Sequence, residues 1–186
     1  ELAAERPLDT LLSGPSGGVS GTVHLGRAAG VPNLVTFDMG GTSTDVCLIR
    51  EFRPEVTQSR QIDGLPIRSA AVDVHTVGAG GSSLAWVDAG GLLRVGPRSA
   101  GASPGPACYG RGGEQPTVTD ANVVLGRLNP THLLAGALPI DAARAVEAIR
   151  RFVAEPRGLS VEDAAAAIIA VSNTNIAQAI RYVSVE

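Results

Sequence analysis

The chain has 186 residues, of which 44% are hydrophobic and 18% charged, with a formal net charge of -3. This composition supplies enough apolar material for the core of one ordinary domain and argues against intrinsic disorder. The lack of a basic tract and the 3% aromatic content argue against nucleic acid as a partner. All 15 cationic side chains are arginine. A P-loop or a Schiff-base mechanism within this chain is therefore excluded, because each needs lysine.

The cysteine spacing and the length of the apolar runs indicate which cellular compartment to expect. Cys47 and Cys108 match no zinc or disulfide spacing, which favours a reduced, cytoplasmic setting. No apolar run reaches the length of a membrane span and no signal peptide is visible, so no membrane partner is expected. The chain starts without methionine and ends inside a predicted helix. We therefore expect residues 1–186 to be a single-domain fragment of a longer protein, with a glycine-rich portion at 1–130 and a helical portion at 139–186.

The first expected element is a helix over residues 17–29. Gly14-Pro15-Ser16 precedes it and offers a cap with proline near the helix start. Three glycines inside it weaken the helix by roughly 1 kcal/mol each relative to alanine, and they predict a close approach by another element. These glycines are Gly17, Gly18 and Gly21.

Strands and turns dominate the middle of the chain. Strands over 34–38 and 45–50 are expected to form a β-hairpin around a glycine-rich turn, and strands over 83–88 and 92–95 a second one. The other expected elements are a third strand at 52–62, a strand or short helix at 71–77, a long loop at 96–116, and helices at 121–128, 141–154 and from 161 onward, the last with a capping-box pattern at Ser160 and Asp163.

The strongest chemical signal is Phe37-Asp38-Met39-Gly40-Gly41-Thr42-Ser43-Thr44-Asp45. A carboxylate ends one strand, a glycine pair makes a tight turn, and hydroxyls alternate before the next strand. The glycines let the backbone turn its N–H groups toward an anion, and Thr42 and Thr44 can donate to phosphate oxygens. Asp38 can hold hydrated Mg²⁺ or orient a water. The alternative is an ordinary hairpin with a glycine turn.

A second glycine-rich segment follows His75 and reads Val77-Gly78-Ala79-Gly80-Gly81-Ser82-Ser83. Its N–H groups can hold a second phosphate or a substrate carboxylate, although it does not match the dinucleotide-binding fingerprint. The alternative is a tight connection between packed strands. For His75 a functional and a structural role both remain open, whereas His24 and His132 are expected to be structural. No histidine pair has helical metal spacing, so no structural zinc is expected.

The long loop at 96–116 is expected to be functional, because loops of this length without secondary structure usually are. Arg98 and Arg111 can clamp an anion there. Cys108 is either a nucleophile or a small buried hydrophobic residue. Asp120, which follows the loop, is interpreted as a helix N-cap or as a residue that contacts substrate or metal.

Five motifs in this order resemble the hydantoinase A and 5-oxoprolinase family, over nearly all of residues 12–129. They are Gly14-Pro15-Ser16-Gly17-Gly18-Val19, Asp38 to Val46, His75 to Gly81, Ser99 to Gly110 and Thr117-Val118-Thr119-Asp120-Ala121-Asn122. The chain departs from the family at Ser82, where a third consecutive glycine is usual.

The resemblance implies half of an actin-like ATPase (ribonuclease H-like) fold, that is, an α/β fold with a mixed sheet, a β-hairpin phosphate loop and flanking helices. It implies ATP-dependent opening of a cyclic amide, such as a hydantoin or 5-oxoproline, through phosphorylation of the amide oxygen, with Mg²⁺ or Mn²⁺. It also implies a B-type partner subunit or domain. The residues implied are Asp38, Asp120 and His75 for catalysis, Asp38 for the metal, and Gly40, Gly41, Thr42, Ser43, Thr44, Asp45, Gly78, Gly80 and Gly81 for the nucleotide.

Two other functions stay open at this point. Relatives of the resembled family include the ATP-using subunits of acetone and acetophenone carboxylases, so a carboxylase subunit is one alternative. A non-catalytic, actin-like scaffold is the other. The resemblance further implies an earlier phosphate hairpin and a later nucleoside-binding segment that these 186 residues do not contain. We therefore expect this chain to hold half an active site and to be inactive alone.

Overall fold

The computed structural model describes residues 5, 13–62, 64–131, 136 and 138–185. They form a mixed α/β structure that divides into two compact units. The first unit comprises Glu1–Asp38, Asp45–Thr76 and Ala179–Glu186, and the second comprises Met39–Thr44 and Val77–Gln178. The units interleave along the chain, because Met39–Thr44 of the second unit stands between two segments of the first. Among the described residues, no helix is both long and apolar enough to cross a membrane.

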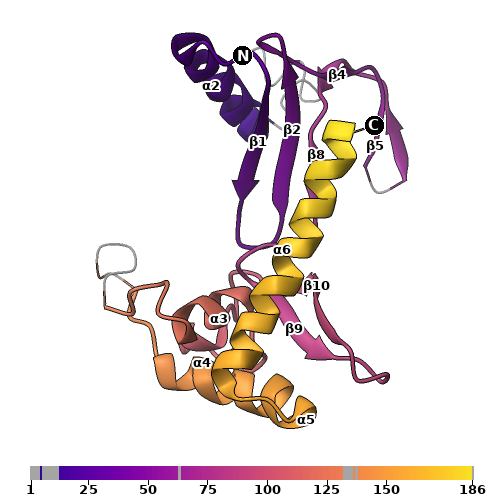
Figure 1. The fold of residues 1–186 in the computed structure, drawn as a ribbon. Coiled ribbons are helices and arrows are strands. Elements are labelled where there is room, and N and C mark those ends of the chain that lie inside the picture. Colours follow the sequence, from indigo (N-terminus) through magenta and orange to yellow (C-terminus); the bar gives the residue numbers. More distant parts are fainter. Residues whose placement is uncertain (1–4, 6–12, 63, 132–135, 137, 186) are drawn as a thin grey trace. The chain divides into compact units, whose positions relative to one another are not determined.

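The first unit is built on the expected hairpin. Helix α2 (Ser13–Ala29) is followed by β1 (Leu34–Met39) and β2 (Thr44–Arg50). Strands β1, β3 (Arg53–Pro54) and β8 (His75–Val77) all pair with β2, so β2 is the centre of this sheet (Figure 1). The predicted helix and both hairpin strands are confirmed.

Helix α2 packs on the sheet through alternate strand residues. Val19 of α2 is buried against Cys47 and Ile49, which are two positions apart on β2 and so point to the same face. A Cβ atom built on Gly26 would lie 2.7 Å from Leu34 Cδ1, so the close approach of helix and strand is at Gly26. The prediction of close approach at the three earlier glycines is wrong, because a Cβ atom there would meet nothing within 4 Å.

The single third strand expected over 52–62 is also wrong. The segment forms three short strands with different partners. Pro54 ends β3, and the prolyl ring leaves no N–H to continue the ladder. The remaining pairs are β4 (Val56–Thr57) with β7 (Ala71–Val72), and β5 (Arg60–Ile62) with β6 (Leu65–Ile67).

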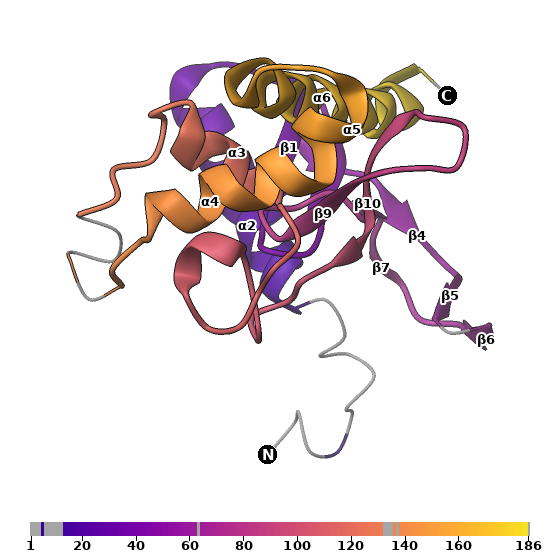
Figure 2. The ribbon, with the colours of Figure 1, turned by 90° about the horizontal axis from the view of Figure 1, so that it is seen from below.

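The second unit contains the second expected hairpin and the helices. Strands β9 (Ser83–Val87) and β10 (Leu93–Ser99) are antiparallel, and β10 runs four residues beyond its predicted end. The helical elements are the 3-10 turn η2 (Ala107–Tyr109), α3 (Val118–Val124), α4 (Ala142–Ile149), the π-helical η4 (Arg150–Ala154), α5 (Glu155–Arg157) and α6 (Val161–Val185). Of these, α3 and η4 contact β9; Figure 2 labels α3 and β9.

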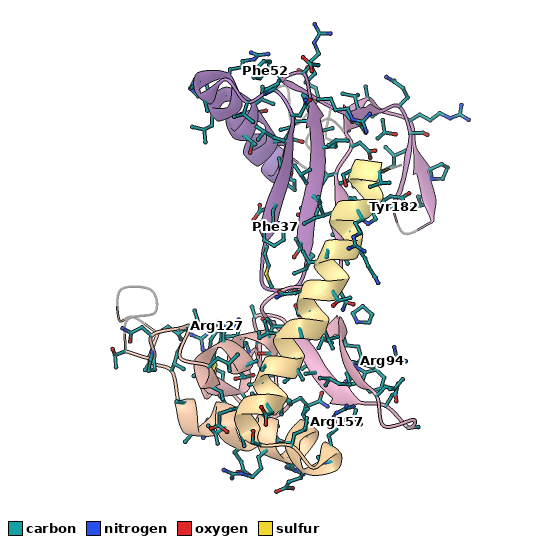
Figure 3. All side chains as sticks on the ribbon, viewed as in Figure 1. Phe37, Phe52, Arg94, Arg127, Arg157 and Tyr182 are labelled. Carbon is teal, nitrogen blue, oxygen red and sulfur yellow. The ribbon has the colours of Figure 1, made fainter. Side chains whose placement is uncertain are left out.

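Small residues let the hairpin and the helices of the second unit share one core. Ala85 of β9 and Val95 of β10 are buried with Ile149, Val153 and Ile168 from the helices. At the hairpin turn, Arg157 donates to the Gly91 carbonyl (2.6 Å) and Arg94 bridges Asp88 (2.8 Å); both arginines are labelled in Figure 3. The expected start of α6 is confirmed, because the Asp163 N–H donates to Ser160 Oγ (3.0 Å).

Candidate functional site

Two of the glycine-rich motifs meet within the second unit. The hairpin turn is Met39–Thr44, between β1 and β2, and the glycine loop is Val77–Ser83, between β8 and β9. Their small residues allow backbone to lie against backbone. The contact fixes the direction of the peptide groups in the turn.

Two backbone hydrogen bonds join the glycine loop to the hairpin turn. The Gly81 N–H donates to the Gly40 carbonyl (3.0 Å), and the Ser82 N–H donates to the Gly41 carbonyl (2.5 Å). Carbonyl and N–H point in opposite directions across a trans peptide. Capture of the two carbonyls therefore turns the N–H groups of Gly41 and Thr42 away from the glycine loop.

The N–H groups of Gly41 and Thr42 are suited to an anion. Both residues are exposed, and among the described residues neither N–H has a backbone or side-chain acceptor. Successive N–H groups that point the same way form an anion-binding concavity. The arrangement can therefore hold a phosphate oxygen.

Gly80 has no room for a side chain. A Cβ atom there would lie 2.7 Å from the carbonyl group of Gly41 and from the carbonyl carbon of Thr42. Gly78 is also tight, since its Cβ atom would lie 3.1 Å from Cβ of Pro97. In this structure Gly80 thus supports the turn by packing and Gly81 by its hydrogen bond to Gly40, whereas Gly78 packs against Pro97.

The hydroxyls of the turn have different partners. Thr44 is fully buried, and its hydroxyl donates to the Ala79 carbonyl (2.5 Å). The Thr44 hydroxyl proton is therefore donated to the glycine loop and not to a ligand. Thr42 is exposed, and its Oγ1 lies 3.1 Å from Oγ of Ser99. Sequence reasoning missed Ser99, whose only signal was its place at the start of the fourth family motif.

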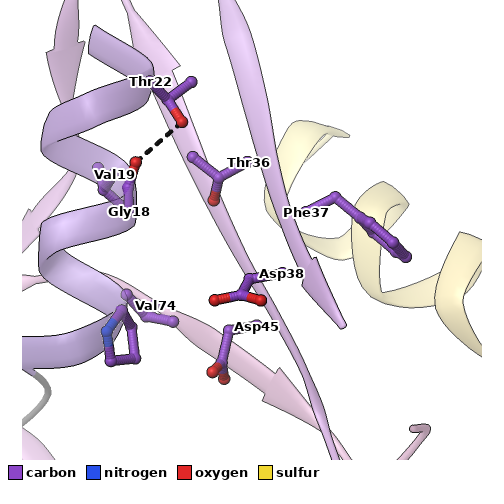
Figure 4. A pocket seen from close by; sticks show the side chains of 9 residues that line it. Gly18, Val19, Thr22, Thr36, Phe37, Asp38, Asp45 and Val74 are labelled. Atoms are coloured by element: carbon purple, nitrogen blue, oxygen red, sulfur yellow. Dashed lines mark hydrogen bonds between the residues drawn. The ribbon is translucent and has the colours of Figure 1, made fainter. Parts of the chain in front are cut away.

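The carboxylates that flank the turn belong to the first unit. Asp38 and Asp45 lie next to each other on β1 and β2, beside a pocket of about 220 Å³ (Figure 4). Helix α2 contributes Thr22 and Gly18 to this pocket, which sequence reasoning did not predict. Asp45 Oδ1 accepts a hydrogen bond from the Thr76 hydroxyl (2.6 Å).

The donor set at Asp38 and Asp45 fits magnesium. Mg²⁺ usually takes one or two protein carboxylates and completes its octahedron with phosphate oxygens and waters. Among the described residues there is no group of three or more His, Cys, Asp or Glu side chains that could hold a metal. A protein-only cage of the zinc type is thus absent from the described part of the chain.

Asp120 occupies a buried supporting position. Its carboxylate accepts from the N–H (2.8 Å) and hydroxyl (2.8 Å) of Thr117 and from the N–H groups of Ala107 (3.2 Å) and Cys108 (2.8 Å). The N-cap prediction is wrong, because Thr117 caps α3 and Asp120 is the third helical residue of a capping box. Helix α3 therefore begins at Val118, and Asp120 fastens η2 to it without contact to solvent.

Thr119 links α3 to the glycine loop. Its N–H (2.8 Å) and its hydroxyl (2.9 Å) both donate to the Gly81 carbonyl. The motif that contains Asp120 thus supports the glycine loop, and through it the hairpin turn.

The two cysteines are free and buried. Burial raises the pKa of Cys47 to about 11, with the charges of Asp73 and Glu55 adding to the shift. Burial, followed by the charge of Asp120, raises the pKa of Cys108 still further. Because the thiolate is the reactive form, the structure favours the buried hydrophobic role of Cys108.

The remaining candidates are His75, Arg98, Arg111 and His132. His75 is half-buried in the first unit, where its ring centroid lies 4.7 Å from that of Tyr182. Arg98 and Arg111 are exposed. His132 lies outside the described residues.

A family model described as hydantoinase/oxoprolinase matches residues 1–186, the whole chain. The chain belongs to this family. It is 43% identical to caprolactamase subunit alpha of Pseudomonas jessenii over 182 aligned residues. The alignment covers 98% of this chain and 26% of the relative. It is also 50% identical to 5-oxoprolinase of Saccharomyces cerevisiae over 126 aligned residues. That alignment covers 66% of this chain and 10% of the relative.

Solved structures agree with this assignment. The crystal structure of ATP-dependent caprolactamase from Pseudomonas jessenii is similar with a TM-score of 0.84 and 44% identity, over 92% of this chain and 25% of that one. The nucleotide-free structure of acetone carboxylase is similar with a TM-score of 0.83 and 38% identity, over 91% of this chain and 24% of that one. The chain thus spans about a quarter of the length of these relatives.

Proposed function

We propose that this chain is part of an ATP-dependent hydrolase that opens a cyclic amide. The observation that carries the proposal is the pair of N–H groups at Gly41 and Thr42, which the glycine loop turns outward as a phosphate site. The names of the relatives support it, since they include an ATP-dependent caprolactamase and a 5-oxoprolinase.

The proposed reaction proceeds through an activated amide. The amide oxygen attacks the γ-phosphorus of ATP, the bond to the bridging oxygen breaks, and ADP leaves. Water then adds to the amide carbon, and breakage of the ring C–N bond leaves a free amine and an acyl phosphate. A second water adds to the acyl carbon, and phosphate leaves with the former amide oxygen. The products are the open amino acid, ADP and phosphate.

The chain's own residues supply positioning and electrostatic stabilisation, which dominate phosphoryl transfer. The N–H groups of Gly41 and Thr42, with the Thr42 hydroxyl, bind phosphate oxygens. Asp38, with Asp45 beside it, would hold the Mg²⁺ or Mn²⁺ that neutralises phosphate charge. We assign Gly40 and Ser43 to the shape of the turn, because the Gly40 N–H donates to the Ser43 carbonyl (2.9 Å).

We further propose that the chain is one half of an actin-like ATPase and acts with a B-type subunit in the cytoplasm. Relatives named as subunits, such as caprolactamase subunit alpha and acetone carboxylase beta subunit, support a partner. The reduced, buried state of both cysteines supports the compartment. Since the chain spans about a quarter of these relatives, we expect it to be inactive alone.

A ketone carboxylase is the second candidate, favoured by the similarity to acetone carboxylase. Bicarbonate distinguishes the two reactions. ATP turnover that requires bicarbonate and a ketone supports the carboxylase, whereas turnover stimulated by a cyclic amide alone supports the hydrolase.

The experiment that tests the role of Asp38 is the Asp38→Asn substitution in the full-length protein with its partner subunit. We expect amide-stimulated phosphate release to fall by about 10²-fold, the scale of losing one group that stabilises charge. Glu162→Gln, which removes an exposed carboxylate from the first turn of α6, is the control and should leave turnover unchanged. Near-normal activity of Asp38→Asn would refute the assignment.

A further inference from the structure

A second cavity borders the hairpin turn within the second unit. It has a volume of about 440 Å³ and lies between Leu84 of β9, the end of β10 and the loop that follows. Ser99 lines the cavity, and its Oγ lies 3.1 Å from Oγ1 of Thr42. The cavity is therefore next to the proposed phosphate site, and the Ser99 hydroxyl lies between them.

The lining of this cavity suits a small, uncharged molecule. Buried Leu84 provides apolar surface, Ser99 and Ser103 provide hydroxyls, and Ala100 and several glycines keep the space open. Its volume falls in the range of small-molecule sites, about 300–1,000 Å³. An acceptor for a phosphoryl group has to lie next to the phosphate that it attacks, and this cavity is so placed.

Glu114 is the one charged side chain among the described residues that line the cavity. It forms no salt bridge with any described residue. Arg144 and Arg151 share a neighbouring pocket with Glu114, but Arg144 pairs with Asp141 (3.3 Å) and Arg151 lies over the ring of Phe152 (5.1 Å). The carboxylate is therefore free to accept a hydrogen bond from a ligand.

We propose that this cavity binds the cyclic amide and selects uncharged amides over anionic ones. The amide oxygen lies at the Ser99 end, next to the phosphate that it attacks, and the amide N–H donates to Glu114. A substrate that carries its own carboxylate, as 5-oxoproline does, is repelled by Glu114. The inference rests on the proposed function and deepens it by naming the class of substrate.

The position of the cavity is tested by filling it in the full-length protein with its partner subunit. Ala100→Leu, which places a larger side chain in the cavity, should raise the KM for the cyclic amide at least tenfold and leave the KM for ATP within twofold. Ala102→Leu is the matched control, because Ala102 is an exposed residue of the same loop that does not line the cavity. Equal amide KM values for the two variants would overturn the inference.

The charge selection is tested with two lactams of the same ring size, 2-pyrrolidinone and 5-oxoproline. The wild-type protein should have the lower KM for 2-pyrrolidinone, and Glu114→Gln should lower the KM for 5-oxoproline by threefold or more. A preference for 5-oxoproline that does not change in Glu114→Gln overturns this inference while the proposed function stands. Absence of ATP turnover with any cyclic amide overturns both.

Discussion

Thr44 shows how one hydroxyl can connect two motifs that are far apart in the sequence. Its side chain is fully buried, and its hydroxyl donates to the carbonyl of Ala79 in the glycine loop. Removal of the hydroxyl leaves a buried carbonyl without its donor, which costs about 1–3 kcal/mol. Thr44 is therefore a positioning residue for the hairpin turn.

This role predicts different behaviour for two conservative substitutions. Thr44→Val keeps the shape but loses the donor, so it should lower the midpoint of thermal unfolding by a few degrees and raise the KM for ATP. Thr44→Ser keeps the donor and should stay close to wild type in both measurements. Equal effects of the two variants would show that the hydrogen bond does not position the turn.

Cys47 and Cys108 are predicted to be unreactive in the folded protein, because burial raises the pKa of each thiol. Iodoacetamide at pH 7.5 should label neither residue in the native protein and both after denaturation, as peptide mass spectrometry can show. Native labelling of Cys108 at the rate of a free thiol would contradict its buried role.

The shift at Cys47 also predicts a pH dependence of stability. Its folded pKa of about 11 exceeds the ordinary value of 9.0, so the unfolded chain loses the proton first as the pH rises. The stabilising contribution is therefore complete below pH 9 and is lost between pH 9 and 11. Thermal unfolding across this range should show a smaller decline in Cys47→Ala than in the wild type.

At the scale of elements, the glycine loop fixes the conformation of the hairpin turn. The contact between the two is tightest at Gly80. Gly80→Ala would bring Cβ to 2.7 Å from the backbone of Gly41, so the turn must move. A displacement of about 1 Å at a reacting group can cost 10²-fold in rate. We expect a loss of that order in amide-stimulated phosphate release.

Gly90→Ala is the control for this prediction. Gly90 lies in the turn between β9 and β10, where the nearest atom to a new Cβ would be a side-chain oxygen of Asp88 at 3.3 Å. Its turnover should match that of the wild type. Full activity of Gly80→Ala would mean that the glycine loop does not set the shape of the turn.

The capping box of α3 is the second element with a measurable role. Asp120→Asn turns an acceptor of four hydrogen bonds into a group with its own N–H donors, so it should lower the free energy of unfolding by more than about 2 kcal/mol. Asp141→Asn should change it little, because Asp141 is an exposed N-cap of α4 and asparagine caps equally well. Equal stability of the two variants in urea unfolding would contradict the buried role of Asp120.

At the scale of the whole molecule, local sequence patterns predicted the elements well where one pattern was enough. The hairpin around Gly40 and Gly41, the second hairpin and the capped start of α6 were all expected from turn and cap residues. The partners of these elements were not, because nothing local shows that Ala79 would accept from Thr44. For the same reason Asp120 was misplaced at the N-cap, since its four donors come from segments before the helix.

The candidate site was only partly visible in the sequence. The motif from Asp38 to Asp45 marked the turn and its two carboxylates, but the direction of its N–H groups depends on the glycine loop. The contributions of Ser99, Glu114 and helix α2 arise from tertiary contacts, which single-sequence patterns do not contain. The chain matches 26% of the length of caprolactamase subunit alpha, so the contacts that the rest of that relative makes lie outside what this sequence can predict.

The most direct measurement is phosphate release by the full-length protein with its partner subunit, with and without cyclic amides. We predict that an uncharged lactam or a hydantoin stimulates ATP hydrolysis and is opened in an amount equal to the ATP hydrolysed, without bicarbonate. ATP turnover that ignores every cyclic amide, or that requires bicarbonate and a ketone, would contradict it.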